Sequence, residues 1–145
     1  MRPSVCFLFA LVCVFTATAE ESPKILTLNK VMKALSRIQQ GLATNTTLFN
    51  SPTTNDLKEC CVPSALECFR TKILSLNVTD NKLKKKQITV FYELRKSMIV
   101  NSISKCTAEE KQKAECRSCD SYEMVNGTKF LENFQTLLQK IYSQG

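Results

Sequence analysis

The placement of the cysteines constrains this chain more than any other feature of its sequence. It contains eight cysteines among 145 residues, and two of them lie in an apolar stretch at the N-terminus. The other six fall between residues 60 and 119, at Cys60, Cys61, Cys68, Cys106, Cys116 and Cys119. An even number of cysteines in an exported domain favours a disulfide framework. We therefore expect a fold that is cross-linked through its middle.

Residues 1–19 have the features of a secretory signal peptide. Arg2 gives a positive start, an apolar run follows, and a small-x-small motif ends at Ala19. The apolar run is about eleven residues long, too short for a bilayer core of about 30 Å, which disfavours a membrane anchor. We expect cleavage between Ala19 and Glu20, followed by one secreted, extracellular domain over residues 20–145.

Three glycosylation motifs of the form Asn-x-Thr support export. They begin at Asn45, Asn77 and Asn126. A glycan must project into water, so each motif predicts a surface loop or a helix end, and we expect a glycoprotein.

Apolar residues recur at three- and four-residue steps in four stretches, which predicts four amphipathic helices. Their approximate ranges are 24–42, 62–78, 83–103 and 129–142. The fourth is the clearest, and Thr128 is its predicted N-cap. Its stripe is the kind that forms a core rather than a cofactor site: Phe130, Leu131, Phe134, Leu137, Leu138 and Ile141. Residues 107–115 are charged and are expected to form a loop.

The connections between these helices predict the topology. The first and third connections have about twenty and about twenty-four residues, whereas the second has about four. Two long crossovers around a short turn are typical of the up-up-down-down arrangement of cytokine bundles. The expected fold is therefore an all-α, short-chain four-helix bundle.

The cysteines could serve three kinds of chemistry. A four-thiolate zinc site on Cys61, Cys68, Cys116 and Cys119 is disfavoured, because the six-residue gap exceeds the usual ligand spacing. A redox dithiol needs a βαβ context that the chain lacks. Disulfides remain, since the two pairs both span about 10 Å and can be matched in either register. Cys60 should bond a different partner from its neighbour, and six cysteines allow 15 connectivities.

Composition excludes several function classes. The chain has no histidine, which removes His-based acid–base catalysis and imidazole ligation, and no Gly-rich phosphate loop. No enzyme activity and no cofactor or metal are expected. The net charge of +7 fits an acidic partner or simply a solvated surface. Basic and aromatic residues do not alternate as in a platform for stacking bases, so no nucleic-acid partner is expected.

Two segments carry a resemblance to a known family. Residues 118–123 (SCDSYE), followed by 129–132 (KFLE), resemble the C-terminal segment of the interleukin-21 branch of the common-gamma-chain cytokines. The Cys-x6-Cys-Phe motif at 61–69 resembles the second helix in the interleukin-21 and interleukin-15 branches. The resemblance implies a secreted immune cytokine, monomeric and not inserted in membranes. It further implies binding to two class I cytokine receptor ectodomains on lymphocytes, the common gamma chain and a private chain.

The same resemblance implies the disulfide pairs Cys61–Cys116 and Cys68–Cys119. Cys60 and Cys106 depart from the family pattern. We predict that they form a third bridge, which would tie the start of the second helix to the end of the third.

The resemblance also assigns receptor contacts. It places Gln139, and Ser143 one turn further on the same face, at the common gamma chain. The private receptor is expected to meet the first and third helices. The acidic residue that interleukins 2 and 15 use on the first helix is absent here, and that helix carries basic residues instead. The expected private-receptor residues are Lys30, Lys33, Arg37, Arg95 and Lys96.

Two alternatives remain open. One is an interleukin-2- or interleukin-15-like member of the same group. The other is a secreted lipid-binding protein of the saposin type, which also has six cysteines, basic charge and amphipathic helices. Saposin-type proteins tie their terminal helices together by disulfides, whereas the first and fourth stretches here contain no cysteine.

Overall fold

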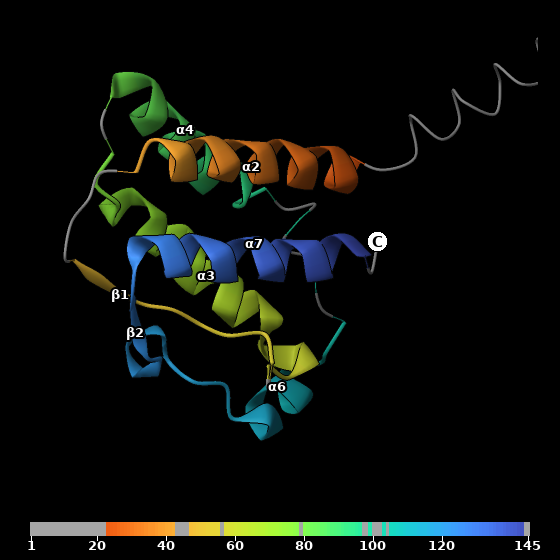
Figure 1. Cartoon of the computed structure of the whole chain (residues 1–145). Coiled ribbons are helices and arrows are strands. Elements are labelled where there is room, and N and C mark those ends of the chain that lie inside the picture. Colours follow the sequence, from red (N-terminus) through yellow and green to blue (C-terminus); the bar gives the residue numbers. More distant parts are fainter. Residues whose placement is uncertain are drawn as a thin grey trace, which may run out of the picture.

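The computed structural model describes residues 23–42, 47–55, 57–78, 80–96, 99, 103 and 105–143. This part of the chain is mostly helical, with one short two-stranded sheet (Figure 1). Its α-helices are α2 (Pro23–Gln40), α3 (Val62–Lys72), α4 (Asn81–Glu93), α6 (Ala108–Ala114) and α7 (Gly127–Ser143). Single 3₁₀ turns lie at η1 (Glu59–Cys61), η2 (Ile73–Ser75) and η3 (Cys119–Ser121). The predicted signal peptide, its cleavage site and Asn45 lie outside the described residues.

One hydrophobic core joins α2, α3, α4 and α7. At its centre the ring of Phe69 stacks on Phe134 at 4.8 Å and meets the edge of Phe130 at 5.4 Å. All three rings are fully buried. The stripe predicted on the last helix is also buried at all six positions. That prediction is therefore confirmed.

Contacts at the helix ends fix the relative directions of the chain. Leu42, just after α2, bridges Val78, just before α4, while Lys30 in the middle of α2 meets Glu93 at the end of α4. A side chain at Gly127 would lie 3.1 Å from a methyl of Leu42, so the start of α7 also meets the end of α2. Helix α2 thus runs opposite to both α4 and α7 (Figure 1).

A small sheet, for which the sequence shows no strand pattern, joins the two long connections. Strand β1 (Leu48–Asn50) pairs antiparallel with β2 (Met124–Asn126), with Phe49 opposite Val125. Phe49 is buried, and its ring lies 5.4 Å from that of Phe130. The inner face of the sheet therefore closes one side of the core.

Helix α3 ends earlier than predicted, at Lys72 instead of residue 78. The buried amide of Gln87 donates 2.8 and 2.9 Å hydrogen bonds to the carbonyls of Ile73 and Leu76. Because Gln87 engages these carbonyls, the chain closes as the single turn η2 and becomes extended at Leu76.

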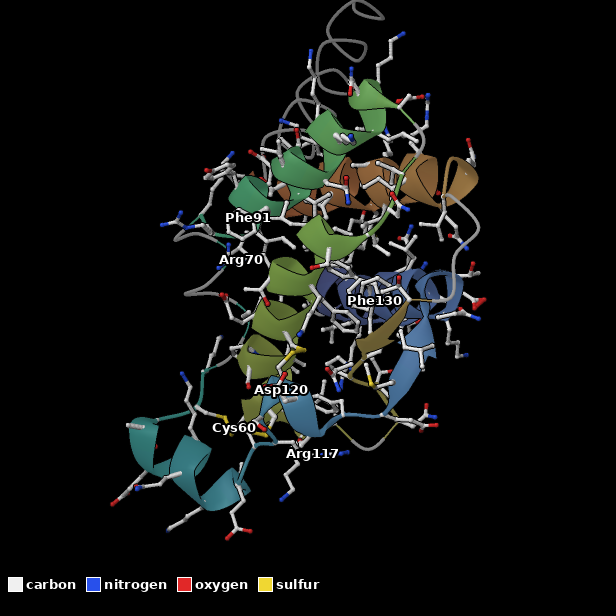
Figure 2. All side chains as sticks on the ribbon, turned by 90° about the vertical axis from the view of Figure 1, so that its left-hand side faces the viewer. Cys60, Arg70, Phe91, Arg117, Asp120 and Phe130 are labelled. Carbon is white, nitrogen blue, oxygen red and sulfur yellow. A yellow bond between two sulfur atoms is a disulfide. The ribbon has the colours of Figure 1, made fainter. Side chains whose placement is uncertain are left out.

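Helix α4 also ends earlier than predicted, at Glu93 instead of residue 103. Figure 2 shows Arg70 of α3 lying against Phe91 of α4. The guanidinium donates a 3.3 Å hydrogen bond to the Phe91 carbonyl. The Arg95 amide, which would bond that carbonyl in a continuing helix, bonds the carbonyl of Tyr92 instead. Residues 97, 98, 100–102 and 104 lie outside the described part.

Two local predictions are wrong. Residues 107–115 were expected to form a loop, but they contain α6, whose start is fixed by a reciprocal capping box between Thr107 and Glu110. Helix α7 begins at Gly127, and Asn126 caps it by accepting a 2.9 Å hydrogen bond from the Lys129 amide. Thr128 lies inside the helix and is not its N-cap.

The six cysteines of the domain form three disulfides. These are Cys60–Cys106, Cys61–Cys116 and Cys68–Cys119, with Cα separations of 5.6, 5.3 and 5.3 Å. These are the two pairs implied by the family resemblance and the third bridge predicted for Cys60 and Cys106. Cys60 and Cys61 hold the two sides of the α6 segment, which is why this short helix, with no buried residue of its own, stays beside η1 (Figure 2).

Candidate functional site

Helix α2 presents a basic outer face. Lys30, Lys33 and Arg37 follow one another at three- and four-residue steps and are all exposed. The opposite side of the helix is buried through Leu28, Val31, Leu35 and Ile38. The helix contains no acidic residue, so its outer face is cationic along its length.

A single carboxylate joins this face to the end of α4. Glu93 lies 3.7 Å from the Lys30 ammonium and 2.9 Å from that of Lys96. Arg95 beside them is exposed. Through Glu93, the structure therefore brings together Lys30 and Lys96, two of the residues predicted to contact the private receptor. The role of Glu93 was missed, although it is the only acidic residue between residues 81 and 105.

Gln139 lies on the exposed side of α7, at its seam with α2. It lines two adjoining shallow hollows, of about 500 and about 340 Å³. The second hollow also contains Lys33 and Arg37. Nearby, the Gln135 amide donates a 3.2 Å hydrogen bond to the Met32 carbonyl and fixes the two helices against each other.

This arrangement differs from the expectation that the two receptor contacts use separate groups of residues. Lys33 and Arg37 were assigned to one receptor contact and Gln139 to another, yet the three residues line one hollow. Lys30, one turn before Lys33 on the same exposed face, does not line this hollow and instead pairs with Glu93 at the end of α4. Sequence reasoning also missed Met32, Ser36 and Gln135 at the seam. The position of Gln135, one turn before Gln139, is the only local signal for them.

Ser143 ends α7 and is exposed, but its hydroxyl donates a 2.9 Å hydrogen bond to the Lys140 carbonyl. Tyr142 beside it is partly exposed. The exposed surface at this end of α7 therefore includes the Tyr142 ring as well as Ser143.

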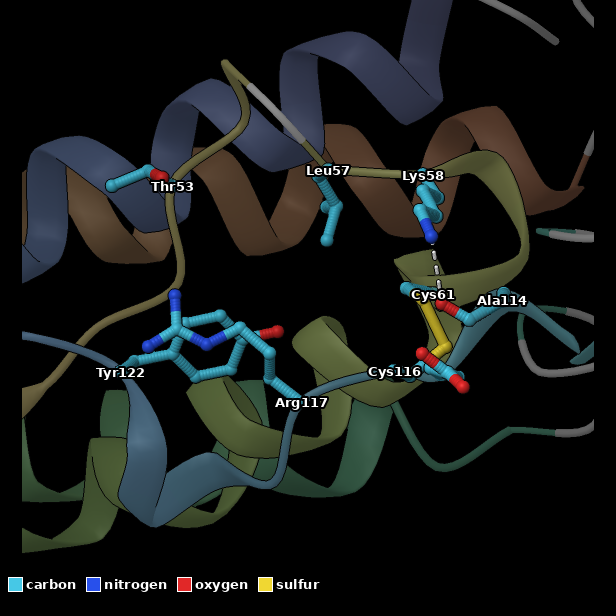
Figure 3. Close-up of a pocket in the computed structure, with 9 residues that line it drawn as sticks. Thr53, Leu57, Lys58, Cys61, Ala114, Cys116, Arg117 and Tyr122 are labelled. Atoms are coloured by element: carbon cyan, nitrogen blue, oxygen red, sulfur yellow. Dashed lines mark hydrogen bonds between the residues drawn. A yellow bond between two sulfur atoms is a disulfide. The ribbon is translucent and has the colours of Figure 1, made fainter. Parts of the chain in front are cut away.

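A separate pocket of about 220 Å³ lies beside the Cys61–Cys116 disulfide (Figure 3). Arg117 covers the ring of Tyr122 at 4.7 Å on one side. On the other, the Lys58 ammonium donates a 2.9 Å hydrogen bond to the Ala114 carbonyl. Both cations are thus engaged in holding the second crossover in place, which indicates a structural role for this pocket.

Two of the three predicted glycosylation sites lie in the described part of the chain. Asn77 and Asn126 are exposed. The cap of α7 uses the Asn126 side-chain oxygen and not the amide nitrogen, which is the atom that a glycan would modify. Within the described ranges, no group of three or more His, Cys, Asp and Glu residues is placed to hold a metal ion.

In that same part of the chain, no helix has the length and apolarity needed to cross a membrane. No family model matches the sequence.

Proposed function

We propose that this chain is a secreted four-helix cytokine of the interleukin-2/15/21 group. In this proposal it binds the common gamma chain and a private class I receptor, and thereby signals in lymphocytes. Three intramolecular disulfides are typical of a domain made for an oxidising, extracellular compartment.

The helix directions support the up-up-down-down cytokine bundle. Helix α2 is antiparallel to α4 and α7, as the bridge from Leu42 to Val78 and the approach of Leu42 to Gly127 indicate. Helix α3 leads through η2 into α4, and Leu76 beyond its end also meets Gly127. These contacts are those expected if α2 and α3 point one way and α4 and α7 the other.

The observation that carries the proposal is the seam between α2 and α7. Gln139, which the family resemblance assigns to the common gamma chain, is exposed there beside Lys33 and Arg37. A surface built from two packed helices, with only shallow hollows along their seam, suits a protein partner better than a small ligand. The gamma-chain contact would then cover both helices.

The second contact would lie next to the first, where α2 meets the end of α4, around Lys30, Glu93, Arg95 and Lys96. The absence of an acidic residue on α2 favours an interleukin-21-like private receptor over an interleukin-2- or interleukin-15-like one. A basic face recruits a receptor with an acidic surface and speeds the encounter at low salt.

Binding of the refolded protein to a panel of common-gamma-family receptor ectodomains tests this function. We expect capture by the common gamma chain and by one private receptor. Gln139→Ala should weaken gamma-chain binding by at least about tenfold, because a central contact would be lost, while the melting temperature stays unchanged.

Gln112→Ala is the matched control, since Gln112 is also an exposed, helical glutamine, on α6. An equal effect of the two substitutions, or a parallel loss of stability in Gln139→Ala, would remove Gln139 from the contact. Failure of every ectodomain to bind, together with binding to lipid vesicles, would favour the saposin-type alternative.

A further inference from the structure

Four lysines crowd the first two turns of α4. Lys82, Lys84 and Lys85 are exposed and Lys86 is half-buried; we call these four residues the lysine run. None of them forms an ion pair with any residue that the structure describes. The nearest acidic residue in the sequence is Asp80, whose carboxylate caps the helix by accepting a 2.9 Å hydrogen bond from the Leu83 amide.

The lysine run covers the outer half of the first two turns of the helix. The inner half is buried through Leu83, Gln87 and Val90, so the four ammonium groups spread from one flank across the outside to the other. The positive end of the helix dipole lies at the same place. Lysines four residues apart repel each other and weaken an isolated helix, and a bound polyanion would relieve that repulsion.

We propose that the lysine run binds a sulfated polysaccharide of the kind displayed on cell surfaces. Such a chain carries closely spaced anionic groups and can follow a cationic ridge without entering a pocket. Three disulfides are typical of a protein in an oxidising, extracellular compartment, where sulfated polysaccharides are the abundant polyanions.

Other polyanions fit the surface less well. Single-stranded nucleic acid is held by rows of aromatic side chains, but Tyr92, two turns further along α4, is the only exposed aromatic residue of this helix. Insertion into a membrane needs a free apolar helix face, and that face of α4 is buried against α2 and η2.

The position of the lysine run separates it from the proposed receptor contacts. It lies at the end of α4 that adjoins the Leu42–Val78 bridge, whereas Glu93 and its partners Lys30 and Lys96 are at the other end. A thirteen-residue helix is about 20 Å long. The proposal therefore does not depend on the receptor assignment.

Elution from immobilised heparin in a salt gradient tests the proposal. The test variant carries Lys82→Gln, Lys84→Gln, Lys85→Gln and Lys86→Gln, which should preserve the helix because glutamine and lysine have similar helix propensity. The matched control loses the same four charges from exposed lysines elsewhere, at Lys105, Lys111, Lys113 and Lys129.

We expect the wild-type protein to bind at physiological ionic strength. The test variant should bind at least about tenfold more weakly, with the control close to wild type, since the charges that act are those within a Debye length of the sulfates. Heparin should also raise the melting temperature of the wild type and not that of the test variant.

Three outcomes would overturn the proposal. Equal weakening in both variants would mean that net charge alone attracts heparin, and unchanged binding in both would place the site elsewhere. Single-stranded DNA or phosphatidylserine vesicles that bind as tightly as heparin, through the same four lysines, would show a surface without preference for sulfated saccharides.

Discussion

Phe134 shows how much a single side chain contributes to this fold. It is fully buried, stacks on Phe69 of α3 and meets Phe130 one turn earlier at 6.1 Å. We expect Phe134→Ala to lower the free energy of unfolding by about 3–5 kcal/mol, because the lost transfer energy and the remaining cavity both act against the folded state. Urea unfolding followed by circular dichroism measures the loss.

Tyr92→Ala is the comparison for that measurement, since the Tyr92 side chain is 57% exposed. Its effect should stay within about 1 kcal/mol. If both substitutions gave the same small change, the aromatic cluster would not be the centre of the core.

For single residues, the sequence predicts whether a side chain lies on the exposed or the buried face of its helix. It does not predict which residues of other helices lie next to it. Helical periodicity was sufficient to place Gln139 on the outside of α7 and Phe134 on the inside. It could not place Gln139 beside Lys33 and Arg37, because that proximity depends on how α7 is aligned against α2. The hydrogen bond from Gln135 to the Met32 carbonyl, which helps to set this alignment, joins residues far apart in the chain.

At the scale of helices and strands, the start of α7 allows a direct test of its N-cap. Asn126 caps the helix through its side-chain oxygen. Asn126→Ala should lower the free energy of unfolding by about 1 kcal/mol, the usual effect of losing an N-cap. Differential scanning calorimetry of the protein made without glycans measures this term alone.

Thr128→Ala separates capping from glycosylation. Both substitutions destroy the same glycosylation motif, but only Asn126→Ala removes the cap. A Thr128→Ala variant as unstable as Asn126→Ala would argue that Thr128, and not Asn126, starts the helix.

The elements that sequence patterns missed have identifiable physical reasons. The four long helices follow from their apolar stripes. The early end of α4 depends on Arg70, a residue of another helix. Helix α6 buries no side chain and so has no stripe, and the Thr107-x-x-Glu110 capping box, the one local signal for its start, was overlooked. Strands of three residues are too short to show alternation.

At the scale of the whole molecule, removal of the Cys60–Cys106 disulfide tests how much this third cross-link stabilises the fold. Cys60–Cys106 spans 46 residues, but with Cys61–Cys116 already formed it closes an additional ring of only roughly a dozen residues. Replacing both Cys60 and Cys106 by alanine should therefore lower the free energy of unfolding by about 3 kcal/mol, somewhat less than an isolated bridge of its span. Guanidinium unfolding of the oxidised double variant measures the difference.

Peptide mapping of the wild-type chain without reduction provides the independent check. A peptide that links Cys60 to Cys106 is expected. Free thiols at these two positions, or Cys60 joined to Cys119, would contradict the pairing.

The two disulfides that flank α6 affect what happens when the chain is cut within this helix. Its two flanking cysteines, Cys106 and Cys116, are bonded to the adjacent Cys60 and Cys61, and no side chain of α6 is buried. A protease that nicks this exposed segment would cut the backbone without releasing a fragment. The cleaved protein would keep its core and migrate as one species on a gel until a reductant separated its two fragments.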